Sequence, residues 1–436
     1  MAVEAVRQGE LNPEIEQAEG IVRRYNTEND TWEMFVKEIP EAEKEFPSVM
    51  LEDQELKDEL KDQKQIDLEV ILDFTYLPVM VEGEEEGERP KNPLLFMAYD
   101  NTDGGVIKAV DGVDVELRRG ATLGIVGESG SGKSVTSLSV MGLLAGTKGK
   151  IADGEILLDG DDIVKLTKEQ QRKLRVSKIS MIFQEPMTSL NPVMKIGDQV
   201  AECVLQHEKI SKKEALKKAE DMLRKTGVPR VEHMMKEYPF QLSGGQRQRV
   251  MIAMALVCKP EILIADEPTT ALDVTIQAKI IELIRRVQKE RGISVIYITH
   301  DLGVVAKVAD YVNVMYAGKI VEKGMINEIF YDPKHPYTWG LLSAMPDLDT
   351  ADERLYTIPG SPPNLLNEKP GDAFAPRNQF ALEIDDKADP PMFQVTDTHY
   401  AATWLLDPRA PKAEMPPELK ERIARMKKEA KIDDGE

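Results

Sequence analysis

A glycine-rich octapeptide carries the clearest chemistry in the chain, because Gly127–Ser134 reads GESGSGKS and fits the pattern G-x-x-x-x-G-K-[ST]. Glycines at these places let consecutive backbone N–H groups point at phosphate oxygens, and a helix that begins there adds a partial positive charge. We expect Lys133 to reach the β- and γ-phosphates of a nucleoside triphosphate and Ser134 to bind Mg²⁺. The residues predicted to bind nucleotide here are Gly127, Glu128, Ser129, Gly130, Ser131, Gly132, Lys133, Ser134 and Val135.

Two adjacent carboxylates follow a second apolar run, in which Glu261–Asp266 reads EILIAD and Glu267 comes next. A buried strand that ends in acids places them at the sheet edge where ligands bind. There Asp266 can orient the water shell of Mg²⁺, and Glu267 can polarise a water for in-line attack on the γ-phosphate. The pair predicts a nucleoside triphosphatase.

A second helix start suited to phosphate is predicted at Ser243, Gly244, Gly245 and Gln246, where LSGGQ precedes the uninterrupted helical segment Arg247–Val257. One chain needs to bind only one triphosphate. The extra element therefore predicts that a second subunit shares the site.

The elements around these residues predict a parallel α/β fold. Ala121–Val126 is an apolar strand candidate that runs into the glycine loop, and Val135–Leu144 is uncharged and helical. From Leu94 onward, short apolar runs alternate with amphipathic stretches over about 240 residues, which is typical of parallel strands and crossover helices. The stretch Ser211–Leu223 has the spacing of an amphipathic surface helix.

Charge separates an N-terminal extension from this α/β unit. The chain has 436 residues and a net charge of −21, and residues 1–93 hold 26 acidic against 10 basic side chains. Residues 41–64 predict an acidic helix or solvated stretch, residues 68–80 a β-rich segment that could pack, and residues 81–90 a flexible linker. The extension contains no catalytic motif, so we expect a solvated or loosely docked segment, with a specific docking element as the alternative.

Composition also restricts the compartment and the partners. Two cysteines are too few to stabilise a chain of this length by disulfides, and the first ten residues lack the apolar stretch of a secretory signal. We therefore expect the protein in a reducing cytoplasm. The longest uncharged run, Ser134–Thr147, is shorter than the roughly 18 apolar residues of a spanning helix, so membrane work would need a partner. The acidity argues against sequence-independent DNA binding.

Together these motifs resemble those of ATP-binding cassette (ABC) proteins, with Gly127–Ser134 as Walker A, Ile262–Glu267 as Walker B and LSGGQ as the signature. The resemblance implies an α/β P-loop NTPase fold. Such a fold has a RecA-like core, a helical subdomain and an antiparallel β-subdomain, here followed by a C-terminal extension.

The resemblance also implies roles for residues outside the first motifs. Gln184, after the strand candidate Ile179–Phe183, would contact Mg²⁺ and the attacking water, and His300, after Ser294–Thr299, would touch the γ-phosphate. Ala271–Asp273 would form the D-loop. The catalytic residues would be Glu267, His300 and Gln184, the metal ligands Ser134, Gln184 and Asp266, and the further nucleotide contacts Ser243, Gly244, Gly245, Gln246 and Asp273.

An aromatic side chain normally stacks on adenine upstream of the glycine loop in this family. Tyr99 is our candidate for that contact, and structural packing is its alternative role.

Further segments resemble the oligopeptide/dipeptide/nickel importer subfamily. They are Phe183–Pro192 (FQEPMTSLNP), Tyr238–Pro239, His335–Thr338 (HPYT) and Ile358–Gly360, and the resemblance covers about residues 94–407. It implies three regions: the acidic extension 1–93, an ATPase domain 94–330 with a helical subdomain at about 186–242, and a C-terminal region 331–436.

This subfamily resemblance implies partners as well. The subunit would bind ATP and Mg²⁺ at the cytoplasmic face of the cell membrane and drive uptake with two membrane permeases, a second homologous ATPase and an external solute-binding protein, without nucleic acid. The transported solute, whether peptide, nickel or oligosaccharide, stays open because this subunit would not touch it.

Two other classes of protein share part of the pattern. A soluble ABC ATPase acting on DNA or ribosomes would share every phosphate motif, but it should show a basic face, paired cassettes or a coiled-coil insertion, and none is visible in the sequence. A phosphotransferase of another P-loop family, or a binding module without turnover, would lack LSGGQ, His300 or Glu267.

One subfamily feature is altered here. Many members carry G-C-x-F-x-P-R-C followed by further cysteines, thought to hold an iron–sulfur cluster. This chain keeps the frame at Gly371–Asn378 but lacks the sulfurs, with Asp372, Asn378, Asp385 and Thr403 at the four positions. Because clusters need thiolates, we expect no iron–sulfur cluster, and we expect Phe374, Phe380 and Trp404 to pack this region. Cys203 and Cys258 lie upstream, where packing is their expected role.

Overall fold

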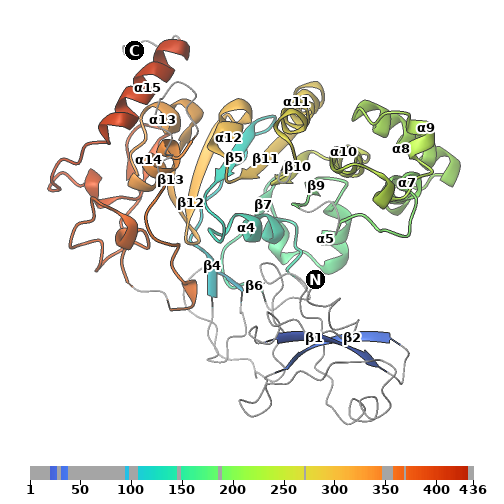
Figure 1. Ribbon diagram of the computed structural model, residues 1–436, viewed down its shortest axis with the longest axis horizontal. Helices are drawn as coiled ribbons and strands as arrows, with labels where there is room; N and C mark the ends of the chain where they lie inside the picture. The colour runs from blue at the N-terminus through green and yellow to red at the C-terminus, as the bar shows by residue number, and fades with distance from the viewer. Residues whose placement is uncertain are drawn as a thin grey trace. The chain divides into compact units, whose positions relative to one another are not determined.

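The computed structural model describes residues 20–26, 31–37, 94–97, 107–144, 149–184, 189–269, 272–345, 357–367 and 370–430 (Figure 1). The chain divides into two compact units, Met1–Glu85 and Glu86–Glu436. In the first unit, β1 (Gly20–Asn26) and β2 (Thr31–Lys37) pair antiparallel in a sheet of their own. Residues 41–64, 68–80 and 81–90 lie outside the described part. No helix among the described residues is long and apolar enough to span a membrane.

An eight-stranded sheet forms the core of the second unit. Five neighbouring strands are parallel, and three strands extend one edge antiparallel. The spatial order is β14 (Phe393–Gln394), β15 (Tyr400–Ala401), β13 (Lys319–Met325), β12 (Tyr311–Tyr316), β5 (Thr122–Val126), β11 (Ser294–Thr299), β10 (Ile262–Asp266) and β9 (Ile179–Ile182).

The parallel strands are buried on both faces, which is why they read as continuous apolar runs. In β11, Ile296 and Ile298 pack in the cluster that includes Leu138, whereas Val295 and Tyr297 pack in the cluster on the opposite face. Helix α4 (Lys133–Val140) covers the first face; α10 (Gly244–Leu256), α11 (Val274–Arg291) and α12 (Leu302–Val308) cover the other (Figure 1). The predicted α/β fold is confirmed.

The helix after the glycine loop is shorter than predicted. It ends at Val140 rather than at Leu144, because Gly142 adopts a left-handed conformation with φ of 62° and its N–H donates to the carbonyl of Ser139. Glycine in this conformation is a common helix stop.

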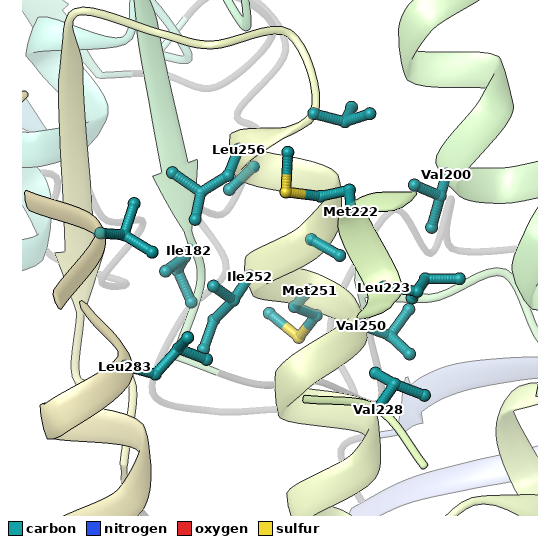
Figure 2. Close-up of a cluster of buried hydrophobic side chains, with 14 of the residues drawn as sticks. Ile182, Val200, Met222, Leu223, Val228, Val250, Met251, Ile252, Leu256 and Leu283 are labelled. Carbon is teal, nitrogen blue, oxygen red and sulfur yellow. The ribbon is translucent and has the colours of Figure 1, made fainter. Parts of the chain in front are cut away.

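Helix α10 joins the core sheet to a group of helices that follows β9. Figure 2 shows Ile252 and Leu256 of α10 beside Ile182, and Val250 on the side of Leu223. The group contains α7 (Ile196–His207), α8 (Lys212–Lys225), α9 (Val231–Met234) and the 3₁₀ turn η2 (Pro239–Gln241).

Helix α8 is amphipathic, as predicted from Ser211–Leu223. Ser211 and Glu214 form a reciprocal capping box at its start, and Ala215, Ala219 and Leu223 are buried. The two cysteines lie at the edge of the same apolar cluster, with their thiol pKa values raised by burial.

A smaller antiparallel sheet precedes and follows the glycine loop in sequence. It has the order β4 (Ile107–Asp111), β3 (Leu94–Met97) and β6 (Lys150–Ile151). The connection to β9 contains β7 (Leu157–Leu158), β8 (Asp161–Asp162), η1 (Ile163–Lys165) and α5 (Lys168–Leu174).

The C-terminal region packs on the β12–β13 end of the core sheet. Phe374 is buried in the cluster that includes Val312 and Val314, Phe380 lies against the same cluster, and Trp404 contacts Phe393 edge to face. The elements are α13 (Ile326–Tyr331), α14 (Pro336–Ser343), η3 (Leu365–Asn367), η4 (Ala375–Arg377), η5 (Trp404–Leu406) and α15 (Pro417–Ala430).

Candidate functional site

Four adjacent parallel strands deliver the predicted catalytic residues to one edge of the sheet. The order β5, β11, β10, β9 places the glycine loop after β5, His300 directly after β11, Asp266 and Glu267 at the end of β10, and Gln184 two residues after β9. Because parallel strands end at the same edge, residues separated by up to 173 positions in the chain converge there.

The glycine loop requires glycine at two close approaches. A Cβ on Gly127 would lie 2.1 Å from the carbonyl oxygen of Met315, and one on Gly132 would lie 2.4 Å from that of Ala109. Gly132 also has a φ of 96° and immediately precedes α4. The loop is therefore packed tightly against two neighbouring strands, as a backbone cradle for phosphate requires.

Lys133 folds back over this loop. Its ammonium donates to the carbonyl oxygens of Gly127 at 2.8 Å and Glu128 at 2.7 Å, and to Oγ of Ser131 at 3.3 Å. Burial lowers the Lys133 pKa, while the carboxylates of Glu267, Asp266 and Glu128 oppose that shift. The site thus holds one buried cation among three acids, at the position where the pattern predicts phosphate.

Asp266 faces the start of α4. Its Oδ1 accepts from the hydroxyl of Ser134 at 3.2 Å and its Oδ2 from that of Ser137 at 3.5 Å. Burial raises the Asp266 pKa to about 6, against the opposing effect of the Ser134 hydrogen bond. A carboxylate beside hydroxyls offers the hard oxygen donors that Mg²⁺ prefers.

Glu267 is held between two other predicted residues. Its Oε2 accepts from the amide of Gln184 at 3.1 Å, and its Oε1 lies 3.3 Å from Nδ1 of His300. The hydrogen bond to Glu267 raises the His300 pKa. Glu267 also has a φ of 44°, unusual for a residue with a side chain, while its N–H donates to the carbonyl of Ile298. This backbone turns the side chains of Asp266 and Glu267 to different partners.

The signature residues form the start of α10. Ser243 caps the helix in a reciprocal box with Gln246, and Gly244 and Gly245 follow the cap. Asp273 caps α11 by accepting from the N–H of Ile276 at 3.0 Å. Among the described residues, no hydrogen bond or ion pair given by the structure joins these groups to the glycine loop of the same chain.

Two predicted contacts lie outside the described residues. Tyr99 is one, and Ala271 of the predicted D-loop is the other. The first part of the segment after Gln184, residues 185–188, lies outside them too.

Sequence reasoning missed two residues that contact the glycine loop. Arg377 pairs with the carboxylate of Glu128, and the Tyr337 hydroxyl accepts the N–H of the same residue at 2.8 Å. Both belong to the C-terminal region. The available signal was weak, because Arg377 was visible only as part of the Gly371–Asn378 frame and Tyr337 only as part of HPYT.

Comparisons with known proteins agree with the geometry. Residues 110–270 match the model of the family described as ABC transporter, and residues 321–384 match that described as oligopeptide/dipeptide transporter, C-terminal region. The chain is 55% identical over 326 residues to the oligopeptide transport ATP-binding protein OppD of Bacillus subtilis, covering 74% of this chain and 91% of that protein. It is also 55% identical over 313 residues to the dipeptide transport ATP-binding protein DppD of Lactococcus lactis, covering 72% and 89%.

Proposed function

Because this chain belongs to the family of ATP-binding subunits of oligopeptide and dipeptide ABC transporters, we propose that it hydrolyses ATP at a site shared between two ATPase subunits and so drives peptide uptake. ATP binding and hydrolysis are the activity of the family. The residues that carry them in this chain, the shared site and the transported solute are the proposal.

The position of the Glu267 carboxylate carries the proposal. It lies between Gln184 and His300 and next to Asp266, at the edge of the sheet that also bears Lys133. A carboxylate there can orient a water in line with the γ-phosphate and take up its proton, while the Lys133 ammonium balances the charge on the phosphate oxygens. His300 is within reach of the same carboxylate and would fix its orientation and contact the γ-phosphate.

The oxygen donors around Asp266 fit a bound Mg²⁺. Ser134 supplies a hydroxyl, Asp266 a buried carboxylate and Gln184 an amide oxygen, all of them hard ligands. A bound Mg²⁺ would neutralise charge on the β- and γ-phosphates. The Oγ of Ser134 and the Oδ1 of Asp266 already lie 3.2 Å apart in a hydrogen bond. Little movement of this chain is therefore needed for both oxygens to face one Mg²⁺.

The position of the start of α10, away from the glycine loop of its own chain, supports a site shared between two subunits. Ser243, Gly244 and Gly245 open a helix of 13 residues, whose N-terminus favours an anion. Since these residues make no described contact with the glycine loop of their own chain, we propose that they close over the γ-phosphate bound by the other ATPase subunit, with Asp273 at the same boundary. ATP then holds the two subunits together, and hydrolysis releases them.

Exposed apolar side chains in the helical group and in the segment just before α7 support docking to a permease. Val193 and Phe240 are 79% and 70% exposed, and the ring of Tyr238 stacks on that of Phe240 with centroids 5.9 Å apart. Membrane permeases are partners of this class of subunit. We further propose two permeases, a second homologous ATPase and an external solute-binding protein as the full assembly, with this subunit peripheral on the cytoplasmic face of the membrane.

Reconstitution of the assembled transporter in proteoliposomes tests the proposal. ATP-dependent accumulation of a labelled peptide, strongly reduced with the Glu267→Gln subunit, is the expected result. Accumulation of nickel or an oligosaccharide instead would overturn the peptide assignment. Co-purification of the chain with ribosomes or DNA rather than with membrane proteins would favour the soluble ATPase class.

A further inference from the structure

Arg377, which lies in the C-terminal region, makes a two-point ion pair with the glycine loop. Its two terminal nitrogens lie 2.6 Å and 3.0 Å from the two carboxylate oxygens of Glu128, although the residues are 249 positions apart. The Arg377 side chain is only 4% exposed and that of Glu128 is 29% exposed. A fork-to-fork pair of this kind fixes direction as well as distance.

The guanidinium is held by its own region before it reaches the loop. Its Nε donates to the carbonyl of Pro359 at 2.8 Å, and one terminal nitrogen donates to the Tyr316 hydroxyl at 3.2 Å. The cation also lies over the rings of Tyr316 and Phe374, with 5.7 Å and 5.9 Å to their centroids. Few rotamers of Arg377 satisfy all of these contacts, so the side chain is preorganised for Glu128.

Tyr337 holds the same loop residue at its backbone. The buried hydroxyl accepts the N–H of Glu128 at 2.8 Å, and the Tyr337 ring packs against those of Tyr316 and Phe374 with centroids 4.7 Å and 5.3 Å away. The carbonyl of Glu128 accepts from Lys133 at 2.7 Å. The same carbonyl accepts the N–H of Ser131 at 3.3 Å. Every polar group of Glu128 therefore has a partner, and two of its four partners come from the C-terminal region.

We propose that Arg377 and Tyr337 are positioning residues that clamp Glu128 and hold the glycine loop in the shape that receives nucleotide. The inference rests on the proposed ATP site and deepens it: nucleotide affinity depends on the C-terminal region, although none of the predicted phosphate-binding residues belongs to that region. A loop ordered in advance has less conformational entropy to lose when ATP binds. Without the contacts of Arg377 and Tyr337, the loop would have to become ordered when ATP binds, and this loss of entropy would weaken ATP binding.

The experiment measures ATP affinity of the full chain by equilibrium dialysis with radiolabelled ATP and Mg²⁺. The variants are Arg377→Lys, Arg377→Ala, Glu128→Ala, the double variant Glu128→Ala/Arg377→Ala, and Tyr337→Phe. Arg409→Ala is the matched control, because Arg409 lies in the same region and, among the described residues, pairs with its near neighbour Asp407.

Arg377→Lys keeps the charge but loses the fork, so we expect about tenfold weaker ATP binding, which is ~1.4 kcal/mol. Glu128→Ala and Arg377→Ala should each weaken binding, and the double variant should be no weaker than the worse single one. In the assembled transporter with the Arg377→Lys subunit, the KM for ATP should rise, while kcat at saturating ATP should stay within about twofold of the wild-type value. This split is expected when ATP binding alone is weakened.

Several outcomes would overturn the clamp. One is wild-type affinity in Arg377→Lys and Tyr337→Phe. Another is a double variant whose loss equals the sum of the two single losses, because independent effects mean no coupling through the pair. If Arg377→Ala fails to fold, Arg377→Lys and Tyr337→Phe decide alone. A wild-type chain that binds no ATP would refute the proposed function itself, an outcome distinct from variants that bind like the wild type.

Discussion

The hydroxyl of Ser134 donates to Oδ1 of Asp266 across 3.2 Å, so the start of α4 and the end of β10 meet at one point. Strand β11 lies between β5 and β10 in the sheet, and the bond bridges past it. Asp266 is thereby directed to the helix, whereas its neighbour Glu267 is directed to Gln184 and His300.

The two acids therefore have separate environments despite being adjacent in sequence. Asp266 is 3% exposed and bound by hydroxyls, while Glu267 contacts an amide and an imidazole. This separation suits one carboxylate for a metal and the other for a water.

The first prediction separates nucleotide binding from hydrolysis. Lys133→Ala should abolish ATP binding, because the phosphates lose their main cation. Glu267→Gln should bind ATP but not hydrolyse it, since an amide keeps the shape of the side chain but cannot accept the proton. ATP should then accumulate and hold the two ATPase subunits together. ATPase rate and ATP-dependent association, measured in the assembled complex, check both expectations.

Glu261→Gln is the matched control for this experiment, because Glu261 directly precedes the other end of β10 and is exposed beside Lys178. It should hydrolyse ATP at the wild-type rate. Full turnover by the Glu267→Gln subunit would refute the assignment of Glu267. Residual activity of the complex alone would not, because the second ATPase subunit brings its own site.

Local sequence signals predicted most of the elements that carry the site. The strand Ser294–Thr299 has the predicted bounds, and the strand at Ile179 ends one residue early. Continuous apolar runs and glycine loops are local features, so one sequence suffices to find them. The end of α4 near Gly142 also has a local signal, the glycine itself, which the sequence interpretation did not use.

Contacts between distant segments could not be predicted in the same way. The pairing of Glu128 with Arg377 joins residues 249 positions apart and depends on how the C-terminal region packs on β12. No spacing or periodicity encodes that distance. The antiparallel pair β1 and β2 was missed because the acidity of the extension dominated its interpretation.

The second prediction concerns pH and His335. This imidazole is fully buried at the start of α14, its Nδ1 accepts the N–H of Tyr337 at 3.0 Å, and burial lowers its pKa to about 3. An unfolded histidine takes up a proton near pH 6.5. The unfolded state therefore binds more protons below that pH, and the free energy of unfolding should fall as pH drops, by up to about 1.4 kcal/mol per unit.

His335→Asn tests this, because asparagine can still cap the helix but cannot ionise. Urea unfolding of the full chain at pH 7.5, 6.5 and 5.5 should show a shallower pH dependence in this variant than in the wild type. His233→Asn is the control, since His233 is 71% exposed and its replacement should leave the slope nearly unchanged. Equal slopes for wild type and His335→Asn would contradict the prediction.

The third prediction concerns the acidic extension. The described contacts of the candidate site involve residues 109–377, within the unit Glu86–Glu436, and β1 and β2 pair with each other in a sheet of their own. Deletion of residues 1–60 should therefore leave ATP affinity within about twofold of the wild type. Residues 68–80 are retained because their β-rich pattern could add to the fold. A folded truncated chain with collapsed ATP affinity would place the extension in the site.

The fourth prediction concerns the four positions where related chains are expected to carry cluster cysteines. The side-chain oxygens there accept backbone N–H groups of their own turns: Asp372 from Phe374 at 2.9 Å, Asn378 from Phe380 at 2.9 Å, Asp385 from Leu382 at 2.6 Å and Thr403 from Leu405 at 3.3 Å. Short polar side chains thus hold these turns through hydrogen bonds, and Phe374 is buried in the core cluster.

Carboxylate, amide and hydroxyl oxygens replace thiolates poorly as ligands of an iron–sulfur cluster. Cys203 and Cys258 cannot substitute, because they lie in the helical group and after α10, with thiol pKa values raised to about 11 and about 12 by burial. We therefore expect the anaerobically purified full chain to be colourless and free of iron and sulfide. A Cys203→Ser/Cys258→Ser variant should give the same metal analysis. Stoichiometric iron and sulfide in the wild type would overturn the prediction, and their persistence in the double variant would mean that another chain supplies the ligands.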